Sequence, residues 1–237
     1  MDFRKYFGIV LALPKTIYFN FHYLPVKSAI KLPIVFMSGI RLVSMKGKIS
    51  FSTPIFTGMV KFGGGNNPLY KQTNYKCVWA DFGGDIVFGK TISFCQGTAL
   101  EIGEEAKLVL GNKVYFGALS KLACYEKIEI GENTNFSWEN IIVDTDFHSI
   151  INVSDGSKRP MCSPIKIGKF NWFGIQSLVL KGTKTPDYCM ISARSLVNKE
   201  HNIPSYTLLG GIPAKLLKEG VYRDFPSHVN LKSLRNK

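Results

Sequence analysis

Large apolar side chains recur at every sixth position between residues 167 and 209. The positions are Ile167, Phe173, Val179, Thr185, Ile191, Val197, Ile203 and Leu209, and only Thr185 is not large and apolar. Small residues precede several of them by two places, namely Ser177, Thr183, Cys189 and Ser195. A period of six is neither the 3.6 of an α-helix nor the alternation of one exposed strand, and it is typical of parallel β-helices. We therefore expect an all-β fold in which the sixth residues point inward and the small ones fit near the corners.

The same period runs through earlier parts of the chain, with interruptions. It includes Phe88, Phe94, Leu100, then Ile102, Leu108, Val114, Ser120, then Ile130, Phe136, Ile142 and His148. A slip of two residues separates the first two series, and a slip of four residues near 123–127 separates the last two. His148 stands where an aliphatic residue is expected, and the period then breaks over residues 149–164. Because long loops in compact folds are often functional, we expect a functional loop at 149–164.

The 237 residues are enough for one large core. We expect an N-terminal cap over 1–42, the β-helix with its loop over 43–212, and a tail over 213–237 with a short helix near 227–235. Residues 3–13 predict a helix that ends at Pro14, and Tyr18 to Pro33 predict extended segments. That helix can pack on the open end of the coil or contact a membrane through an aromatic and basic face, and both readings stay open.

Composition and charge narrow the partners. The chain is 45% apolar and 20% charged, as in globular proteins, but its net charge is +13. No nucleic-acid-binding module is recognisable, so nucleic acid is not expected, and phosphorylated ligands come before a membrane surface. The five cysteines are odd in number and irregularly spaced, which argues against disulfides. The apolar run Phe7 to Leu13 is too short to cross a bilayer, so we expect a cytoplasmic protein; work at the inner face of the membrane stays open.

The motif Asp144-Thr-Asp146-Phe-His148 is the candidate for proton transfer. Histidine accepts and returns protons near neutral pH, and a neighbouring carboxylate can fix its tautomer. Positions 144, 146 and 148 of a strand point to one face, which would bring the three groups together. The alternative is that both aspartates bind turn amides while His148 lies at an interface.

Other kinds of site are less well supported. None of His22, His201 and His228 pairs with His148 at metal-ligand spacing, so no catalytic metal is expected. No serine or cysteine nucleophile is recognisable, which leaves direct transfer assisted by a base. Trp172 precedes an inward position by one residue and should face outward, as a ligand-binding wall or as packing under the 149–164 loop.

Three segments in this order resemble the hexapeptide-repeat acyltransferases, in particular the O-acetyltransferases of sugars and surface polysaccharides. The segments are Phe136 to His148, Ile167-Gly168 to Gly174, and Gly211-Ile-Pro-Ala-Lys215. The resemblance covers about residues 86–218 and implies a left-handed parallel β-helix that forms a homotrimer, with active sites between subunits. The left hand departs from the usual rule for parallel strands, and the repeat itself requires it.

The resemblance also implies the reaction and its residues. Acetyl-CoA is the expected acyl donor, His148 the general base and Trp172 an aromatic of the cleft. Ala193 and Lys199 would lie beside the coenzyme arm and Lys215 near its phosphates. Arg194, where the family has a small corner residue, would add a phosphate contact or narrow the channel. The expected function is O-acetylation of a sugar or glycan; the alternatives are N-acetylation of an amino-sugar nucleotide and a non-catalytic β-helix scaffold.

Overall fold

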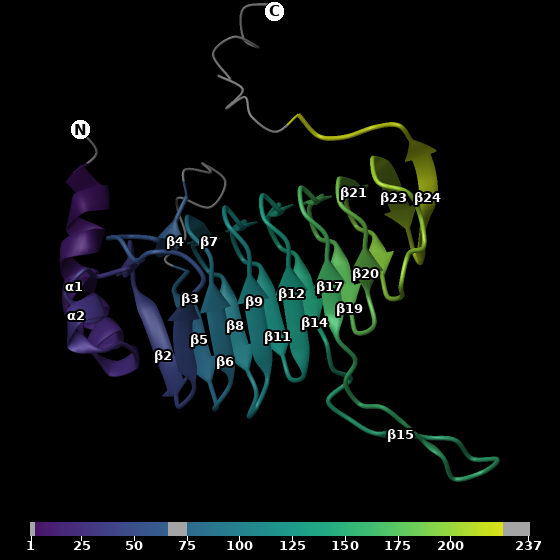
Figure 1. Ribbon diagram of the computed structural model, residues 1–237, viewed down its shortest axis with the longest axis horizontal. Helices are drawn as coiled ribbons and strands as arrows, with labels where there is room; N and C mark the ends of the chain where they lie inside the picture. Colours follow the sequence, from purple (N-terminus) through teal and green to yellow (C-terminus); the bar gives the residue numbers. More distant parts are fainter. Residues whose placement is uncertain (1–2, 66–74, 225–237) are drawn as a thin grey trace, which may run out of the picture.

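Three parallel sheets wind into one coil in the computed structural model, which describes residues 3–65 and 75–224 (Figure 1). Sheet A contains, in spatial order, β1 (Ile34–Phe36), β4 (Val60–Gly64), β7 (Ile92–Cys95), β10 (Tyr115–Phe116), β13 (Asn135–Phe136), β18 (Trp172–Phe173), β21 (Cys189–Ile191), β23 (Thr207–Gly211) and β24 (Ala214–Glu219). Sheet B contains β2 (Ile40–Met45), β5 (Cys77–Asp81), β8 (Ala99–Ile102), β11 (Lys121–Cys124), β14 (Ile141–Val143), β19 (Leu178–Leu180) and β22 (Leu196–Val197). Sheet C contains β3 (Lys48–Phe51), β6 (Asp85–Phe88), β9 (Lys107–Leu110), β12 (Lys127–Ile130), β17 (Ile165–Ile167) and β20 (Lys184–Thr185). The chain visits A, B and C in turn, which confirms the expected parallel β-helix.

The residues of the six-residue pattern form the interior of the coil. Between 167 and 209 every sixth position is buried except Ile203, which is partly buried against the core. The corner residues Ser177, Thr183, Cys189 and Ser195 are buried as well. Inside sheet A the pattern places phenylalanines one above another. Successive rings of Phe62, Phe94, Phe116, Phe136 and Phe173 stack at centroid distances of 4.4, 4.9, 5.0 and 4.5 Å.

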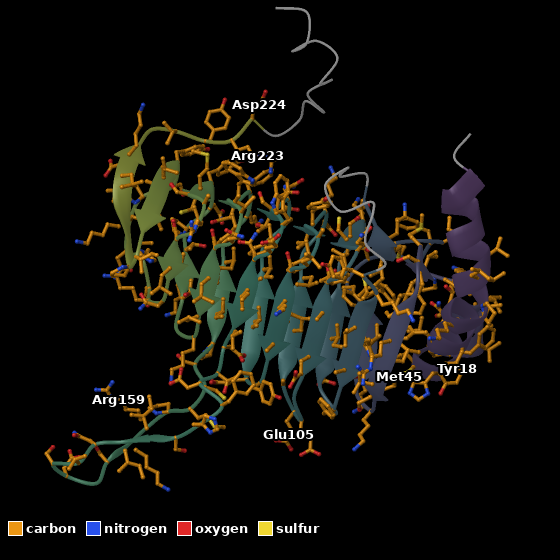
Figure 2. All side chains as sticks on the ribbon, turned by 180° about the vertical axis from the view of Figure 1, so that it is seen from behind. Tyr18, Met45, Glu105, Arg159, Arg223 and Asp224 are labelled. Carbon is orange, nitrogen blue, oxygen red and sulfur yellow. The ribbon has the colours of Figure 1, made fainter. Side chains whose placement is uncertain are left out.

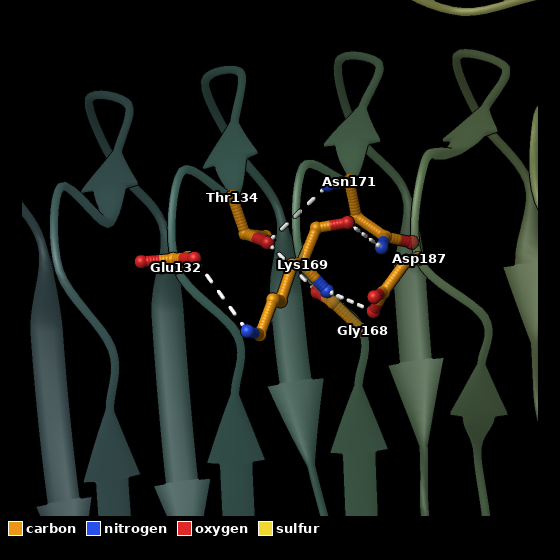
Figure 3. A network of polar contacts seen from close by, with 6 residues as sticks. All are labelled: Glu132, Thr134, Gly168, Lys169, Asn171 and Asp187. Carbon is orange, nitrogen blue, oxygen red and sulfur yellow. Dashed lines mark hydrogen bonds and ion pairs between the residues drawn. The ribbon is translucent and has the colours of Figure 1, made fainter.

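Polar side chains secure the corners between sheets C and A (Figure 3). The buried Asn171 donates from Nδ2 to Lys169 O at 3.0 Å and to Pro186 O at 2.8 Å, joining two successive coils. Thr134 Oγ1 donates to Gly168 O at 3.0 Å. The amide of Lys169 donates to Asp187 Oδ1 at 2.7 Å. Each corner therefore hydrogen-bonds to the corners of its neighbours, because the turn amides and carbonyls point along the coil rather than within it.

The N-terminal end of the coil is covered by α1 (Phe3–Tyr23) and α2 (Val26–Ala29). Asn20 of α1 completes the edge of β1: its Nδ2 donates to Ile34 O at 2.7 Å and its Oδ1 accepts from Ile34 N at 3.1 Å. Thr16 Oγ1 accepts from Phe36 N at 3.2 Å. Lys15 Nζ donates to Ile40 O of β2 at 2.9 Å. Side chains of α1 thus replace the missing strand at the open end, where unpaired backbone groups would otherwise be exposed.

This role explains why the helix differs from the prediction. We expected it to end at Pro14, followed by extended segments from Tyr18 to Pro33, but α1 continues through Pro14 to Tyr23 and α2 follows. Pro14 removes one helical hydrogen bond. The buried residues around it, Ala12, Thr16 and Phe19, pack against the coil and hold the helix together.

The ends of the coil also lie differently from the expected segment bounds. β1 begins at Ile34, so the first strand of sheet A lies within the segment 1–42. After residue 212, β24 runs antiparallel to β23 and closes the C-terminal end of sheet A. The helix predicted near 227–235 lies outside the described residues.

Candidate functional site

The chain leaves the coil at the corner between β14 and β17 and forms an arm, residues 144–164. The arm extends away from the body of the coil and carries the antiparallel pair β15 (Ile150–Ile151) and β16 (Lys158–Arg159) (Figure 1). An antiparallel bridge between Thr145 and Cys162 closes its base. The loop expected at 149–164 is therefore an ordered hairpin together with its base.

His148 lies on this arm and is exposed. It does not occupy an inward position, although the count of six placed it there, because the coil is interrupted after Val143 and resumes at Ile165. Among the described residues His148 has no hydrogen-bond or ion-pair partner, and its imidazole is free to meet a ligand.

Asp144 does not face His148, contrary to the expected common face of positions 144, 146 and 148. Its side chain is fully buried, with Oδ1 accepting from the amide of Tyr125 at 2.7 Å. Its Oδ2 accepts from Glu126 N at 3.0 Å and Lys127 N at 2.9 Å. The carboxylate thus holds the turn where the six-residue count slips by four, which is the alternative noted for the aspartates.

Asp81 shows that this is a recurring structural device. In sheet B, Asp81 pairs with Ile102, and Ile102 pairs with Cys124. On the following coil, Asp144 lies beside Cys124, because Ala123 pairs with Val143. Asp81 is also fully buried, and its oxygens accept from the amides of Gly47, Gly83 and Gly84 at 2.9–3.1 Å. Two aspartates at the same corner of the coil therefore bind turn amides in the same way.

Asp146 is held by Lys181 rather than by His148. Lys181 Nζ lies 2.5 Å from Asp146 Oδ2 and also donates to Pro160 O at 2.6 Å and Met161 O at 3.2 Å. One ammonium group thus binds both the outgoing and the returning segment of the arm at its base. Nothing in the sequence pattern singled out Lys181, which lies on the coil outside the predicted motif. It positions the arm, and with it His148.

An aromatic contact supports the base of the arm from the other side. The rings of Tyr125 and Phe147 meet edge to face at a centroid distance of 5.2 Å. Tyr125 donates a short hydrogen bond to Glu101, and burial, followed by this carboxylate, raises the pKa of Tyr125 to about 12. Tyr125 is therefore a neutral donor at physiological pH, and it fixes the residue that directly precedes His148.

Beside the arm, sheet B turns an apolar surface outward. We call it the apolar face; it consists of Ile141, Val143, Leu178, Leu180 and Leu196. The residues at outward positions of sheet C in the same part of the coil are charged, namely Glu129, Lys166 and Lys184. In this part of the coil the outer surface of sheet C is therefore suited to water, whereas that of sheet B carries contiguous half-buried aliphatic side chains.

Trp172 faces outward from sheet A, as the pattern predicted, but its indole ring contacts other side chains. Its Nε1 donates to Ser137 Oγ at 3.2 Å. The guanidinium of Arg223, a residue that Figure 2 labels, lies 5.4 Å from the centroid of the indole ring, a cation–π contact. Burial lowers the pKa of Arg223, which stays cationic at neutral pH. Arg223 was not found from sequence, because it reaches Trp172 only when the chain after β24 turns back along the coil.

The residues expected to bind the coenzyme surround the last coil. Ala193 and Arg194 form the exposed corner between sheets A and B, and Arg194 has a left-handed φ of 55°. Lys199 follows β22 at the next corner, between sheets B and C, and Lys215 lies on β24; both are exposed. The apolar face lies between the two corners. Ala193 and Arg194 thus share one corner and Lys199 lies at the next one. Lys215 pairs with Gly210 of β23, and the carbonyl of the preceding residue, Leu209, accepts from the amide of Ser192.

Two further findings concern the described residues, 3–65 and 75–224. No group of three or more His, Cys, Asp or Glu side chains in them could hold a metal ion. None of their helices has the length and apolar character needed to cross a membrane.

Comparisons with known proteins agree with this architecture. No family model matches the sequence. A "Probable acetyltransferase Rv3034c" of Mycobacterium tuberculosis (strain ATCC 25618 / H37Rv) is 31% identical over 116 residues, which are 48% of this chain and 38% of that protein. The matched region thus spans well under half of the relative's length.

A solved structure shows the same fold. The polySia-specific acetyltransferase NeuO is similar with a TM-score of 0.54 and 19% identity, covering 85% of this chain and 82% of that one. A variant of AntD, an N-acyltransferase from Bacillus cereus solved with dTDP and coenzyme A, has a TM-score of 0.47 and 14% identity over 90% and 96% of the two chains. The chain therefore has the left-handed β-helix fold of the hexapeptide-repeat acyltransferases and is related, over about half its length, to a probable acetyltransferase.

Proposed function

We propose that the protein is an acetyltransferase that moves the acetyl group of acetyl-CoA to a hydroxyl of a sugar or glycan, with His148 as the general base. The observation that carries this proposal is the placement of His148. It stands unpartnered on an arm that Lys181 fixes at its base, and this base adjoins Val143 and Leu180 of the apolar face. The relation to a probable acetyltransferase supports the reaction class.

A second copy of the chain is proposed to cover the apolar face. Five aliphatic side chains without a charge among them are costly to leave in water, and another protomer would bury them. The arm starts from the corner next to this face, so a protomer seated there would lie against His148 and complete a cleft. A homotrimer, which the family resemblance implies, closes such a repeated contact.

The proposed reaction is a direct transfer. His148 accepts the proton of the acceptor hydroxyl as its oxygen attacks the thioester carbonyl carbon. A C–O ester bond forms, the C–S bond breaks, and the departing sulfur takes the proton back from the imidazolium to leave free coenzyme A. Because Asp144 binds turn amides and Asp146 binds Lys181, neither carboxylate orients His148 within one protomer. Their proposed part is to position the arm.

Cations suited to the coenzyme's phosphates lie at several places on the C-terminal coils. Arg194, Lys199 and Lys215 are exposed, and Arg223 lies over Trp172. Phosphate groups bind arginine and lysine through charge-assisted hydrogen bonds. The exposed corner at Ala193 offers backbone beside this charge, which suits an extended ligand. These residues would hold the donor, while Trp172 would act through its contact with Arg223.

Free-thiol release from acetyl-CoA in the presence of a panel of sugars, glycans and amino sugars tests this function, with products identified by mass spectrometry. Turnover with hydroxyl acceptors supports it. Turnover confined to amine acceptors would replace O-acetylation by N-acetylation. Absence of coenzyme A binding at low salt would contradict the enzyme and favour a non-catalytic scaffold.

A further inference from the structure

The outer surface of the N-terminal helices is apolar, although it lies at the end of the molecule. On α1 the buried residues Ala12, Thr16 and Phe19 face the coil. The opposite side carries exposed apolar side chains at helical spacing: Val10, Leu11, Leu13, Ile17, Tyr18 and Phe21, with exposed fractions between 42% and 66%. Val26 on α2 and Ile30, the C-cap of this helix, are exposed by 67% and 63%. We call these eight residues the end face.

Basic side chains do not interrupt this surface between Gly8 and Tyr23. From Gly8 to Tyr23 the sequence contains one lysine, Lys15, and one histidine, His22. Lys15 donates to Ile40 O, and His22 Nε2 contacts Met45 O at 2.6 Å, so both turn toward the coil. A helix packed on the coil only to cap it would carry polar residues outside. The end face is therefore suited to an apolar environment rather than to water.

The charge of the chain is concentrated at this same end. Residues 3–80 contain eleven lysines and arginines and no aspartate or glutamate, whereas residues 81–237 contain nineteen basic and sixteen acidic residues. With Asp2 included, residues 1–80 thus carry +10 of the net +13. Such an asymmetry favours a strongly anionic partner, and it opposes pairing with the same end of a second copy.

Lysines stand directly beside the end face. Lys27 follows Val26 on α2, and Lys31 follows Ile30 just beyond the helix; both lysines are exposed. They line a groove of about 510 Å³ between α2 and β3. The groove also contains Thr53, whose buried hydroxyl has no hydrogen-bond partner. An anionic head group at this place would meet two ammonium groups.

We propose that the end face docks on an anionic lipid bilayer. The apolar side chains of α1 and α2 lie in the interface between head groups and acyl chains, while Lys27 and Lys31 bind lipid phosphates. The helix lies on the bilayer and does not cross it, in keeping with its length and apolar character. The arm and the last coil lie away from this end, so docking leaves the candidate site free (Figures 1 and 2). The proposal is independent of acetyl transfer.

Co-sedimentation of the full-length protein with vesicles tests this. The vesicles consist of phosphatidylcholine alone or of phosphatidylcholine and phosphatidylglycerol in equal parts. Val10→Gln with Ile17→Gln removes apolar surface at constant charge, and Lys27→Glu with Lys31→Glu reverses the flanking charge. Lys107→Glu with Lys166→Glu, on exposed positions of sheet C, is the control with the same change of charge.

The wild type is expected to bind the anionic vesicles and to stay in solution with phosphatidylcholine. Each test pair should weaken binding by about tenfold or more, since one surface lysine contributes roughly fivefold. The control pair should bind like the wild type. The proposal is overturned if the wild type stays in solution with both vesicles, as it would if an acidic protein were the partner. It is also overturned if the control loses as much as the lysine pair, or if the glutamine pair binds normally, which would mean unspecific adsorption.

Discussion

Replacing Asn20 with leucine tests how the open end of the coil is stabilised. Leucine keeps the branching and the number of side-chain heavy atoms of asparagine but cannot hydrogen-bond the edge of β1. Ile34 N and Ile34 O, which now lie 3.1 and 2.7 Å from the Asn20 side chain, would lose their partners in a buried place. Each buried unpaired group costs about 1–3 kcal/mol, so the free energy of unfolding should fall by about 2–6 kcal/mol.

Guanidinium denaturation at one fixed protein concentration measures this change. Circular dichroism follows the whole coil. Fluorescence follows Trp79, whose ring lies 5.0 Å from that of Phe19, a residue of the helix α1 that also carries Asn20. Asn202→Leu, at an exposed position on the last coil, is the matched control and should change stability by less than about 0.5 kcal/mol. A change equally small for Asn20→Leu would refute the role of α1 as a substitute strand.

Three further predictions concern the arm, the thiols and the apolar face. Lys181→Met should loosen the arm, and amide hydrogen exchange in 145–162 should quicken by roughly tenfold while the rest of the coil stays unchanged; unchanged exchange would contradict the clamp. Ellman's reagent near neutral pH should label Cys162 quickly and the other four cysteines only after unfolding. Those four are buried, and burial raises the pKa values of their thiols, to about 11 for Cys77 and Cys189. A fast labelling phase that survives Cys162→Ser would contradict this. Leu178→Glu places a charge in the apolar face and should give monomers in sedimentation velocity, whereas an unchanged mass would show that no copy covers that face.

The six-residue period predicted the interior of the coil well because each inward position repeats the same physical environment. Phe136, Phe173 and Val179 are buried where the count placed them. The period also located the arm, as a break, but not the place of His148. A count of sequence positions continues through an insertion, whereas the coil itself stops at Val143 and resumes at Ile165.

Tertiary contacts account for what the sequence did not show. Pro14 is a sound local signal for the end of a helix, yet the hydrogen bonds of Thr16 and Asn20 to β1 outweigh it. The role of Asp144 could have been found, since the slip of four residues near 123–127 needs a partner for its amides. Lys181 and Arg223 act across the coil and leave no pattern in the sequence.

The most direct test of the proposed chemistry is the rate of acetyl transfer by His148→Ala. Coenzyme A release is measured with saturating acetyl-CoA and an acceptor of the wild type, beside Asp155→Asn at the exposed tip of the same arm as control. Loss of a general base should lower kcat by about 10²–10⁴-fold while coenzyme A binding and the circular dichroism spectrum stay those of the wild type, and the control should keep its rate. A His148→Ala enzyme that turns over within a few-fold of the wild type would contradict the assignment of His148 as the base.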